Sequence, residues 1–415
     1  MYNKQRTILI LPSYFSPEIY SSSHLDYDLY NHLVDNNYKL IVFTPTPTRG
    51  VSNEVRTQTK KRETLLNGKM IIHRFSLFGE KKDTYLRAFR YLLSICIQFF
   101  KGLFTSGFDI VLLVSTPPII GIVGGLLHLI KRVPFVYVVQ DIFPDSLVNT
   151  GLSHKGSLAW KIGRIIENFT YRNATRIIVI SQDFRSNLLK KNVPEEKIEV
   201  IHNWIDTTSI FPVERCNNIL FSEWELSPSL FYIVYAGNFG NAQSVHTIIE
   251  SAQLLQSETD IQFLLIGGGS QEDTLKELVT SYKLLNVKFF PLQSSEKLSL
   301  IYSLGDVGIV CCKKGMGKNA FPSKTWSYLA AGTPIIASYD LDSELASMAN
   351  SNGFGISINP ENAKEMADSI LKLRNNKQLL QEMSSTAKTF VESHASRKKA
   401  MERYLQVINS VISSN

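Results

Sequence analysis

The sequence predicts an α/β fold with two doubly wound domains, each built on a mostly parallel sheet covered by helices. Two observations carry this prediction. Short apolar runs alternate with helical patterns along most of the chain, and the run Phe231–Ala236 restarts an alternation that begins with Thr7–Leu11. In addition, 415 residues exceed what one core usually holds, which favours two domains of roughly 200 residues each.

Composition and charge limit the class of protein. Hydrophobic residues make up 44% of the chain and charged residues 20%, which is the balance of a globular protein. The formal net charge of +7 suits phosphorylated ligands, an anionic membrane surface or nucleic acid. No helix-turn-helix, zinc-finger or stacking-platform signature accompanies the charge, so we expect no nucleic acid partner.

Cysteine usage and the apolar segments favour a cytoplasmic protein. Cys96, Cys216, Cys311 and Cys312 show no paired metal-ligand spacing, and the last two lie in an apolar run typical of a buried strand. The apolar run in residues 1 to 12 is too short for a signal peptide. No stretch reaches the length of a membrane-spanning helix, so we expect a protein that can touch a membrane without crossing it.

The first strand and helix frame a polar loop. Thr7–Leu11 predicts a buried strand, and leucines at helical spacing between Leu25 and Leu33 predict a helix. The loop between them holds Glu18 and the serines Ser21, Ser22 and Ser23, at the sheet edge where ligands bind. These groups predict a polar ligand site, and a helix cap with solvated serines is the alternative.

A basic and apolar region follows the second predicted strand, Lys39–Phe43. Residues 44–69 are polar and rich in turns, and we expect a mobile connection there. The apolar segment 91–104 predicts either an interfacial helix at a membrane or a helix that packs in the core. Two groups of basic residues precede that segment. The first is Arg49, Arg56, Lys60, Lys61 and Arg62, and the second is Arg74, Lys81, Lys82, Arg87 and Arg90.

A carboxylate stands at the end of a later strand. Asp109–Val114 and Val133–Val139 predict parallel strands, with a glycine-rich helix from Pro117-Pro118 between them. Asp141 directly follows the second strand, where it could accept a hydroxyl proton or orient a substrate hydroxyl. A cap on the following turn is the alternative.

The first half continues to about residue 206. A helix at 158–171 and strands at 176–180 and 198–201 complete it, and the weakly apolar stretch 206–229 marks a connection between domains.

The second half repeats strands that end in glycine-rich loops. Phe231–Ala236 leads into Gly237-Asn238-Phe239-Gly240, and Ile261–Ile266 leads into Gly267-Gly268-Gly269. Glycines there let a backbone approach a phosphate closely, although a simple tight turn is the commoner explanation. Further strands are predicted at 287–290 and 307–312, and Lys313, Lys314, Lys318 and Lys324 suggest a diphosphate site at their edge.

The stretch Phe321–Ser338 predicts a loop, helix, turn and strand. Phe321-Pro322-Ser323-Lys324 would open a helix over 325–331, where free backbone N–H groups favour an anion. Gly332 would take the left-handed position that ends the helix, ahead of the strand 335–337. An ordinary helix start with a solvated Lys324 is the alternative. Three helices are predicted in the tail, at 363–373, 379–391 and 397–412.

Seven segments in order carry a resemblance over nearly the whole length. The chain resembles the large family 4 of GT-B glycosyltransferases, and more narrowly bacterial transferases that build O-antigen and capsule, including N-acetyl-L-fucosamine transferases. The segments are YFSPE, QDIFPDSL, IENFTYRNATRIIVIS, HNWID, YAGNFGNAQ, LLIGGG and FPSKTWSYLAAGTPIIA. The resemblance implies two Rossmann-like domains that face each other across a cleft.

The resemblance also implies roles for these parts. Residues 1–206 would bind the acceptor, 207–390 would bind the nucleotide sugar, and 391–415 would return as a helix to the first domain. Asp141 would face the sugar and the acceptor, with Glu18 and Ser22 on the acceptor side. The donor site would contain Gly237, Asn238, Gly240, Gly267, Gly268, Phe321, Pro322, Ser323, Lys324 and Ser327.

The implied reaction is sugar transfer with retention of anomeric configuration. The donor would be a nucleotide diphosphate sugar, usually a UDP-sugar, and the acceptor an undecaprenyl-diphosphate-linked saccharide at the inner face of the cytoplasmic membrane. No cofactor or metal is expected, because a helix terminus and cations would neutralise the leaving diphosphate.

The chain departs from the family pattern in its carboxylates. The Glu-x7-Glu motif is absent, with Asn319 near its first position and Ser327 at its second. The loop after Gly240 lacks the Arg or Lys common in the family, and Ser21-Ser22 replaces a glycine pair. Two alternatives therefore stay open: a non-catalytic or partner-dependent GT-B subunit, and a sugar-nucleotide epimerase of the same fold.

Overall fold

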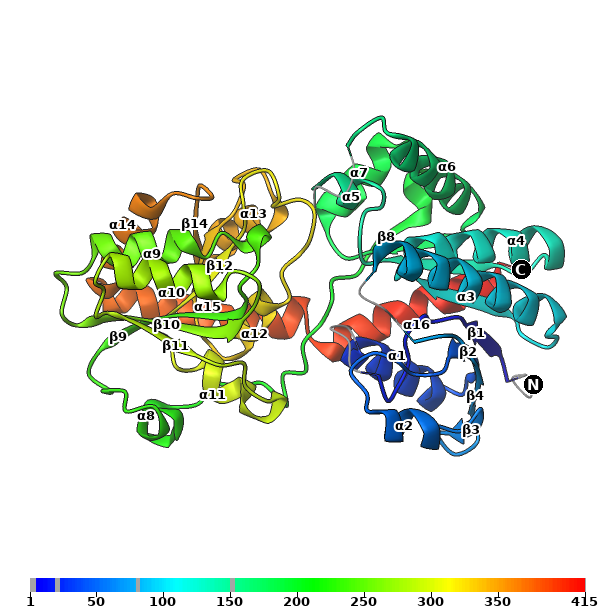
Figure 1. The fold of residues 1–415 in the computed structure, drawn as a ribbon, viewed down its shortest axis with the longest axis horizontal. Helices are drawn as coiled ribbons and strands as arrows, with labels where there is room; N and C mark the ends of the chain where they lie inside the picture. The colour runs from blue at the N-terminus through cyan, green and yellow to red at the C-terminus, as the bar shows by residue number, and fades with distance from the viewer. Residues whose placement is uncertain (1–4, 19–22, 80–82, 150–153, 415) are drawn as a thin grey trace. The chain divides into compact units, whose positions relative to one another are not determined.

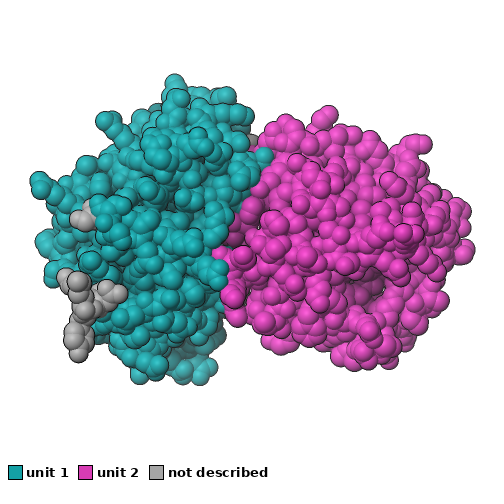
Figure 2. Space-filling view, turned by 180° about the vertical axis from the view of Figure 1, so that it is seen from behind, with its two compact units in different colours: residues 1–201, 400–415 teal, residues 202–399 magenta. Residues whose placement is uncertain are grey.

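The computed structural model describes residues 5–18, 23–79, 83–149 and 154–414, and it divides the chain into two compact α/β units (Figure 1). Unit 1 contains residues 1–201 and 400–415, and unit 2 contains residues 202–399 (Figure 2). These boundaries differ slightly from the expected 206/207 and 390/391. Val391 and Ala395 belong to the apolar core of unit 2, so the chain returns to unit 1 only inside the last helix.

Unit 1 is built on an eight-stranded sheet. Its strand order is β3-β4-β2-β1-β5-β6-β7-β8, and every neighbouring pair is parallel except β3 and β4. The central strands are buried on both faces, which explains their continuous apolar runs. The strands are β1 (Thr7–Ile10), β2 (Lys39–Pro45), β3 (Arg62–Leu65), β4 (Met70–Phe75), β5 (Ile110–Val114), β6 (Phe135–Val139), β7 (Arg176–Val179) and β8 (Ile198–Val200).

Helices cover both faces of this sheet. Right-handed crossovers place the helices after β4, β5 and β6 on the opposite face from α1. Helix α16 lies with α1 and β2, and its Asn409 accepts a hydrogen bond from the Tyr38 hydroxyl. The helices are α1 (Ser23–Asp35), α2 (Asn53–Gln58), α3 (Thr84–Phe104), α4 (Gly121–Lys131), α5 (Asp145–Asn149), α6 (Leu158–Asn173), α7 (Gln182–Lys190) and α16 (Arg397–Ser413).

The structure adds two features to the basic region that the sequence did not predict. Residues 44–69 contain helix α2 and strand β3, where a mobile connection was expected. Arg74 and Arg90 are buried, so they do not belong to a solvated basic surface. Arg74 forms an ion pair with Glu63 at 2.7 Å, and the Arg90 guanidinium donates to the carbonyl oxygen of Phe78 at 3.0 Å. Both side chains tie loops of the ligand edge together. Lys81 and Lys82 lie outside the described residues.

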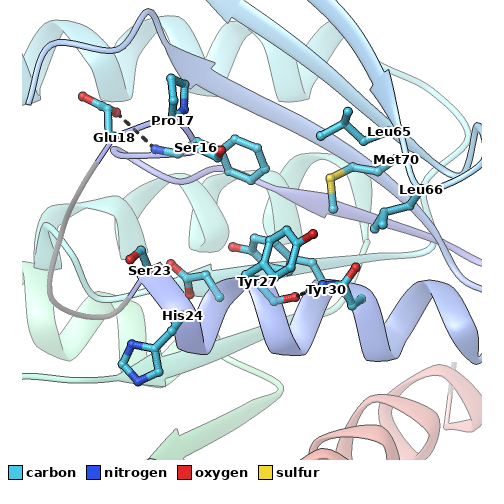
Figure 3. Close-up of a pocket in the computed structure, with 13 residues that line it drawn as sticks. Ser16, Pro17, Glu18, Ser23, His24, Tyr27, Tyr30, Leu65, Leu66 and Met70 are labelled. Atoms are coloured by element: carbon cyan, nitrogen blue, oxygen red, sulfur yellow. Dashed lines mark hydrogen bonds between the residues drawn. The ribbon is translucent and has the colours of Figure 1, made fainter. Parts of the chain in front are cut away.

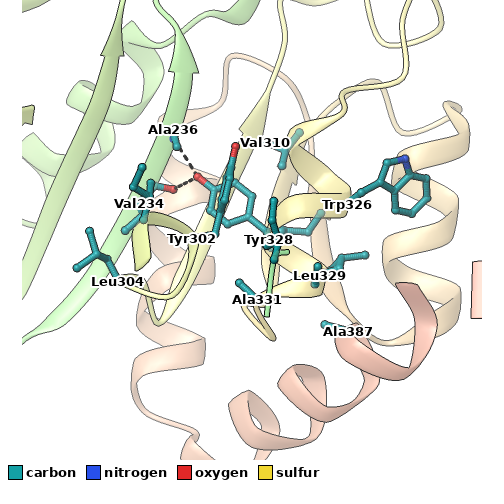
Figure 4. Close-up of a cluster of buried hydrophobic side chains, with 14 of the residues drawn as sticks. Val234, Ala236, Tyr302, Leu304, Val310, Trp326, Tyr328, Leu329, Ala331 and Ala387 are labelled. Carbon is teal, nitrogen blue, oxygen red and sulfur yellow. Dashed lines mark hydrogen bonds between the residues drawn. The ribbon is translucent and has the colours of Figure 1, made fainter. Parts of the chain in front are cut away.

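Unit 2 is built on a six-stranded parallel sheet. Its strand order is β11-β10-β9-β12-β13-β14. One apolar cluster packs on each face of the sheet, and Figure 4 shows part of the one around Tyr328 and Trp326. The strands are β9 (Phe231–Asn238), β10 (Ile261–Gly268), β11 (Val287–Phe290), β12 (Val307–Cys311), β13 (Ile335–Ser338) and β14 (Gly355–Ile358).

The helices of unit 2 follow its strands in regular alternation. They are α8 (Leu220–Glu223), α9 (His246–Leu254), α10 (Glu272–Ser281), α11 (Leu298–Tyr302), α12 (Lys324–Ala330), α13 (Glu344–Asn352), α14 (Ala363–Arg374) and α15 (Lys377–His394). Gly332 adopts φ +70° just after α12, as the sequence predicts, and strand β13 follows. None of the helices in the described part of the chain is long and apolar enough to cross a membrane.

Candidate active site

The glycine loops of the second half meet at the ends of β9 and β10. The two strands pair in parallel, with Gly267 beside Gly237 and Gly268 beside Asn238. Gly237 has φ +150° and Gly267 has φ +151°, which L side chains rarely adopt. A Cβ on Gly267 would lie 1.9 Å from the carbonyl oxygen of Gly237, so only glycine fits there. The sequence therefore identified two loops that the fold brings into contact.

Lys324 lies against the first of these loops. A Cβ on Gly237 would lie 2.7 Å from the Lys324 Nζ, although the two residues are far apart in sequence. The ammonium also lies 3.9 Å from the centroid of the Tyr235 ring, in cation–π contact. Lys324 is the first residue of α12, so the turn after β12 and the end of β9 converge on one cation.

The Lys324 ammonium lacks a hydrogen-bond acceptor. Its Nζ is buried and has no hydrogen-bond partner among the described residues. Burial lowers the pKa of Lys324 to about 8, because the charged form has lost its water. A buried cation in this state favours an anionic ligand that would restore the missing hydrogen bonds.

The start of α12 adds less to the site than the sequence suggested. The helix is only seven residues long, and Ser323 at its N-cap makes no side-chain capping hydrogen bond. Phe321 stacks on Trp326 with ring centroids 4.8 Å apart, which fixes the loop before the helix on the core. Lys318 forms an ion pair with Asp342, and Lys313 lines a separate cavity of about 740 Å³ next to Gly240 and Asn241. Lys324 is therefore the lysine whose ammonium the structure sets against Gly237.

Two tyrosines support the glycine loop, and the sequence analysis missed both. The Tyr328 hydroxyl donates to the carbonyl oxygen of Val234 at 2.8 Å and accepts from the N–H of Ala236 at 2.9 Å (Figure 4). The Tyr235 hydroxyl donates to the carbonyl oxygen of Asn238 at 2.7 Å. Both tyrosines lie in apolar runs, so only the folded arrangement shows that their hydroxyls satisfy the backbone of β9.

Ser327 points into the core of unit 2. The residue is buried, and its side chain forms a hydrogen bond with the Tyr302 hydroxyl.

The Asp340 carboxylate holds the backbone of the loop between β12 and α12. It accepts from the N–H groups of Gly315 at 2.9 Å and Gly317 at 2.8 Å. These contacts fix the loop between β12 and α12, a role that the sequence did not reveal.

Asp141 stands at the carboxyl end of β6 in unit 1, as expected. The residue keeps exposed surface, yet the surrounding protein raises the pKa of its carboxyl above the ordinary range. Desolvation is the main cause, and hydrogen bonds from the Ser146 side chain and the Ile142 backbone oppose it. Asp145, four residues later, forms an ion pair with Lys191 at 2.8 Å, which anchors the loop that carries Asp141.

Glu18 is a buried residue that holds two loops together. One carboxylate oxygen accepts from the N–H of Phe15 at 3.1 Å, and the other accepts from Thr48 at 2.7 Å and Arg49 at 3.0 Å. Burial raises the pKa of Glu18, and these three hydrogen bonds oppose the shift. Ser22, the other residue expected on the acceptor side, lies outside the described residues.

A cavity of about 440 Å³ opens beside Glu18 in unit 1. Figure 3 shows Tyr27 and Tyr30 rising from α1 towards the loop after β1 and the β3–β4 hairpin. Leu65, Leu66 and Met70 form an apolar wall, and the polar lining includes the carboxylates of Asp26 and Glu18 together with serine, histidine and asparagine side chains. No lysine or arginine lines this cavity in the described part of the chain, so it suits a neutral ligand better than a phosphate.

Metal ligands do not gather in the part of the chain that the structure describes. No group of three or more histidine, cysteine, aspartate or glutamate side chains there could hold a metal ion. The four cysteines are free thiols, and Cys311 and Cys312 are buried.

Together, the two units define a class of protein. Each carries a doubly wound parallel sheet with ligand-edge loops, and unit 2 sets an unpartnered buried cation against a glycine loop. Two families match successive parts of the chain: Glycosyltransferase Family 4 at residues 27–209 and Glycosyl transferases group 1 at residues 218–390. The chain belongs to the GT-B glycosyltransferases that combine these two domains.

Curated relatives cover most of the chain. It is 25% identical over 312 residues to the probable glycosyltransferase WbjE of Pseudomonas aeruginosa, and the aligned region covers 74% of this chain and 76% of WbjE. It is 23% identical over 412 residues to the putative colanic acid biosynthesis glycosyl transferase WcaI of Escherichia coli (strain K12), and the aligned region covers 97% of this chain and 99% of WcaI.

Solved structures share the fold of the whole chain. Sucrose-phosphate synthase from Thermosynechococcus elongatus matches with a TM-score of 0.78 and 16% identity, over 99% of this chain and all of that one. Anabaena Alr3699/HepE in complex with UDP matches with a TM-score of 0.72 and 13% identity, over 98% of this chain and 100% of that chain. At these identities the likeness shows the fold alone.

Proposed function

We propose that the chain is a retaining glycosyltransferase that moves a sugar from a nucleotide diphosphate, UDP in the first instance, to a lipid-linked saccharide in bacterial surface polysaccharide synthesis. The donor sugar would be N-acetylated, as in N-acetyl-L-fucosamine. The name of WcaI, a putative colanic acid biosynthesis glycosyl transferase, supports the class of product, and the UDP complex of the structurally similar HepE supports the nucleotide.

The buried Lys324 ammonium is the observation that carries this proposal. A diphosphate beside Gly237 would give the Nζ its missing acceptor and balance the buried charge. The same contact would stabilise the negative charge that grows on the leaving diphosphate as the sugar bond breaks. Lys324 would thus take the place of a metal ion, and we propose that the reaction needs no metal or cofactor.

Unit 1 offers a place for the acceptor. The cavity beside Glu18 combines tyrosines, aliphatic side chains and carboxylates, which suit the neutral saccharide of an undecaprenyl-diphosphate-linked acceptor. Carboxylates would repel the diphosphate, which must therefore lie outside this cavity. In the proposal Asp141 orients or deprotonates the acceptor hydroxyl, and the raised pKa of its carboxyl brings it closer to neutral pH.

A transfer assay tests the proposal. The purified chain is incubated with a panel of UDP-sugars, including UDP-N-acetyl-L-fucosamine, and with lipid-linked saccharides. We expect transfer from one donor, α-to-α or β-to-β retention by NMR of the product, and unchanged rates in EDTA. Failure to bind UDP and to transfer any sugar would contradict the proposal.

A second candidate is a partner-dependent GT-B subunit. The position at which the family holds a glutamate is Ser327, whose side chain is already bonded to Tyr302 in the core. A chain that binds UDP but transfers sugar only with a co-purified partner would support this candidate. Release of free UDP without an acceptor would instead favour an epimerase-type reaction.

A further inference from the structure

Helix α3 buries several polar side chains, together with Ile95, and leaves other apolar side chains exposed to solvent. Arg90, Ser94 and Gln98 are buried, and the Gln98 amide donates to the carbonyl oxygens of Pro12 at 2.9 Å and Phe43 at 3.1 Å. A surface helix normally buries its apolar stripe. Hydrogen bonds to loops therefore help to fix the orientation of α3, and a stripe of apolar side chains is left outside.

The outward stripe of α3 is continuous. Phe89, Leu92, Phe100 and Phe104 are spaced by helical turns along one side, and each is between 53% and 81% exposed. Cys96, also exposed, lies between Leu92 and Phe100. Phe100 stacks on Phe104 with ring centroids 6.4 Å apart, so these rings pack on each other in solvent. From Phe89 to Phe104 the stripe is about 22 Å long at the rise of an α-helix.

Two neighbouring helices extend the apolar surface. Helix α4 packs against both α3 and α6, and Figure 1 shows the three helices together on one side of the unit 1 sheet. Lys131 of α4 donates to the carbonyl oxygen of Leu103 at 3.0 Å, which joins the ends of α4 and α3. The apolar face comprises Phe89, Leu92, Phe100 and Phe104 of α3, Leu129 and Ile130 of α4, and Leu158, Ile162 and Ile165 of α6, all of them exposed.

Basic side chains outnumber acidic ones around the apolar face, and Asp83 at the N-cap of α3 is the acidic residue nearest to it in the sequence of that helix. Residues 84–104 and 121–131 contain no aspartate or glutamate. Helix α6 contains Glu167 alone, which is buried and paired with Lys191 at 2.8 Å. Arg132, Lys161 and Arg172 are exposed at or near the ends of α4 and along α6. The surface is thus apolar in its middle and cationic at its margin.

We propose that the apolar face docks the protein on an anionic lipid bilayer. Exposed apolar side chains beside cations are suited to the boundary between acyl chains and negatively charged headgroups. A second copy of the chain would fit less well, because a two-fold contact through this face would bring like charges together. This inference rests on the proposed function, because docking on a bilayer would serve an enzyme whose acceptor is linked to a lipid.

Docking through this face would also bring Asp141, the residue proposed to act on the acceptor hydroxyl, near the lipid. Gly163 of α6 packs on Phe143 and Pro144, where a Cβ would lie 2.9 Å and 2.6 Å from their side chains. The helix that carries Leu158, Ile162 and Ile165 is therefore in contact with the loop that starts at Asp141. A saccharide held near Asp141 could keep its lipid in the bilayer.

Vesicle co-sedimentation of the full chain tests the proposal. We compare vesicles of phosphatidylglycerol mixed with phosphatidylcholine against vesicles of phosphatidylcholine alone. We expect binding to the anionic vesicles, weakened by salt. The double variant Phe100→Ser, Phe104→Ser should lower the partition coefficient about tenfold or more, because two large apolar side chains no longer enter the lipid. The variant Lys161→Ala, Arg172→Ala should weaken binding to anionic vesicles only.

The matched control changes exposed leucines of unit 2. Leu285→Ser, Leu292→Ser removes side chains that are 94% and 77% exposed but belong to unit 2 and not to the apolar face, and it should bind vesicles like the wild type. UDP affinity, which reports on unit 2, should be the same in all variants. Equal vesicle binding by the phenylalanine variant and the wild type would overturn the proposal. So would a wild-type dimer in sedimentation velocity that the phenylalanine variant converts to monomer.

Discussion

Lys324 is the residue on which donor binding should depend most. Replacing it with alanine removes a charge-assisted hydrogen bond to the diphosphate, so we expect Lys324→Ala to weaken UDP binding by about 1.5–3 kcal/mol in isothermal titration calorimetry. Lys318→Ala is the matched control, because Lys318 is an exposed lysine already paired with Asp342. Equal affinities for the Lys324 variant and the wild type would place Lys324 outside the donor site.

The lowered pKa of Lys324 predicts a pH dependence of donor binding. Below about pH 8 the ammonium is charged in the free protein, and above it the folded protein has lost the proton. An anion binds the charged form, so binding above that pH must take up a proton. We expect the dissociation constant for UDP to rise by up to about tenfold per pH unit there. Lys324→Met should bind weakly at every pH, and a similar slope in that variant would assign the effect to another group.

The lowered pKa of Lys324 also makes the free energy of unfolding depend on pH, and the direction of that dependence follows from the burial of the ammonium. The folded protein releases the proton at about pH 8, whereas the unfolded chain keeps it to its ordinary, higher value. Between those values the unfolded state binds more protons, so the contribution of Lys324 to the free energy of unfolding rises with pH. Lys324 thus makes unit 2 less stable at neutral pH, and the chain keeps a destabilising group where a ligand can use it.

Sequence reasoning found Lys324 but could not establish its environment. The motif gave its position at a helix start, and a solvated surface lysine stayed open as the alternative. Burial of the Nζ depends on the Tyr235 ring and on the backbone of Gly237, which belong to a strand distant in sequence. The side-chain environment of a single residue is a tertiary property, and a motif alone does not contain it.

At the scale of elements, strand β9 depends on a side chain from helix α12. The Tyr328 hydroxyl satisfies a donor and an acceptor of the β9 backbone at Ala236 and Val234, just before the Gly237 loop. Tyr328→Phe leaves both groups buried and unpaired, so we expect it to lower the free energy of unfolding by about 1–3 kcal/mol in urea denaturation. UDP affinity should also fall, because the loop loses part of its support.

Tyr282→Phe provides the comparison for this variant. Tyr282 is a partly exposed residue at the end of α10, and loss of its hydroxyl should change stability by less than about 0.5 kcal/mol. If Tyr328→Phe proved equally mild, the β9 backbone would not depend on that hydroxyl.

The elements themselves were predicted unevenly. Buried parallel strands such as β1, β6 and β10 are continuous apolar runs, and the sequence identified them well. Strands β3 and β14, RETL and GISI, are short and less apolar, and they were missed. For α3 the sequence predicted either an interfacial helix at a membrane or a helix that packs in the core, and the structure shows a helix that buries polar side chains together with Ile95 and exposes other apolar ones. That orientation depends on hydrogen bonds from Gln98 and Arg90 to distant loops.

At the scale of the whole molecule, unit 1 is completed by the end of the chain. Met401, Tyr404, Ile408 and Val411 of α16 are at most 3% exposed. Deleting residues 400–415 would expose their partners, so we expect unit 1 to unfold at a lower temperature or not to fold. Scanning calorimetry should show the loss, and UDP should still stabilise the transition of unit 2.

Ser410→Ala is the control for the deletion, because Ser410 lies on the exposed side of α16. It should leave both transitions in place. A deletion variant with both transitions unchanged would show that unit 1 folds without α16, against the burial of its side chains.

The return of the chain to unit 1 also sets an order of synthesis. Unit 2 is one contiguous segment, 202–399, whereas unit 1 is formed by residues 1–201 and 400–415. During translation the later segment can fold as soon as it has left the ribosome, while the earlier one waits for the final helix. Until residues 400–415 have emerged, the side chains that α16 covers in the folded protein stay uncovered. The nascent chain therefore exposes apolar surface of unit 1 for as long as α16 is absent, and a chaperone would act in that interval.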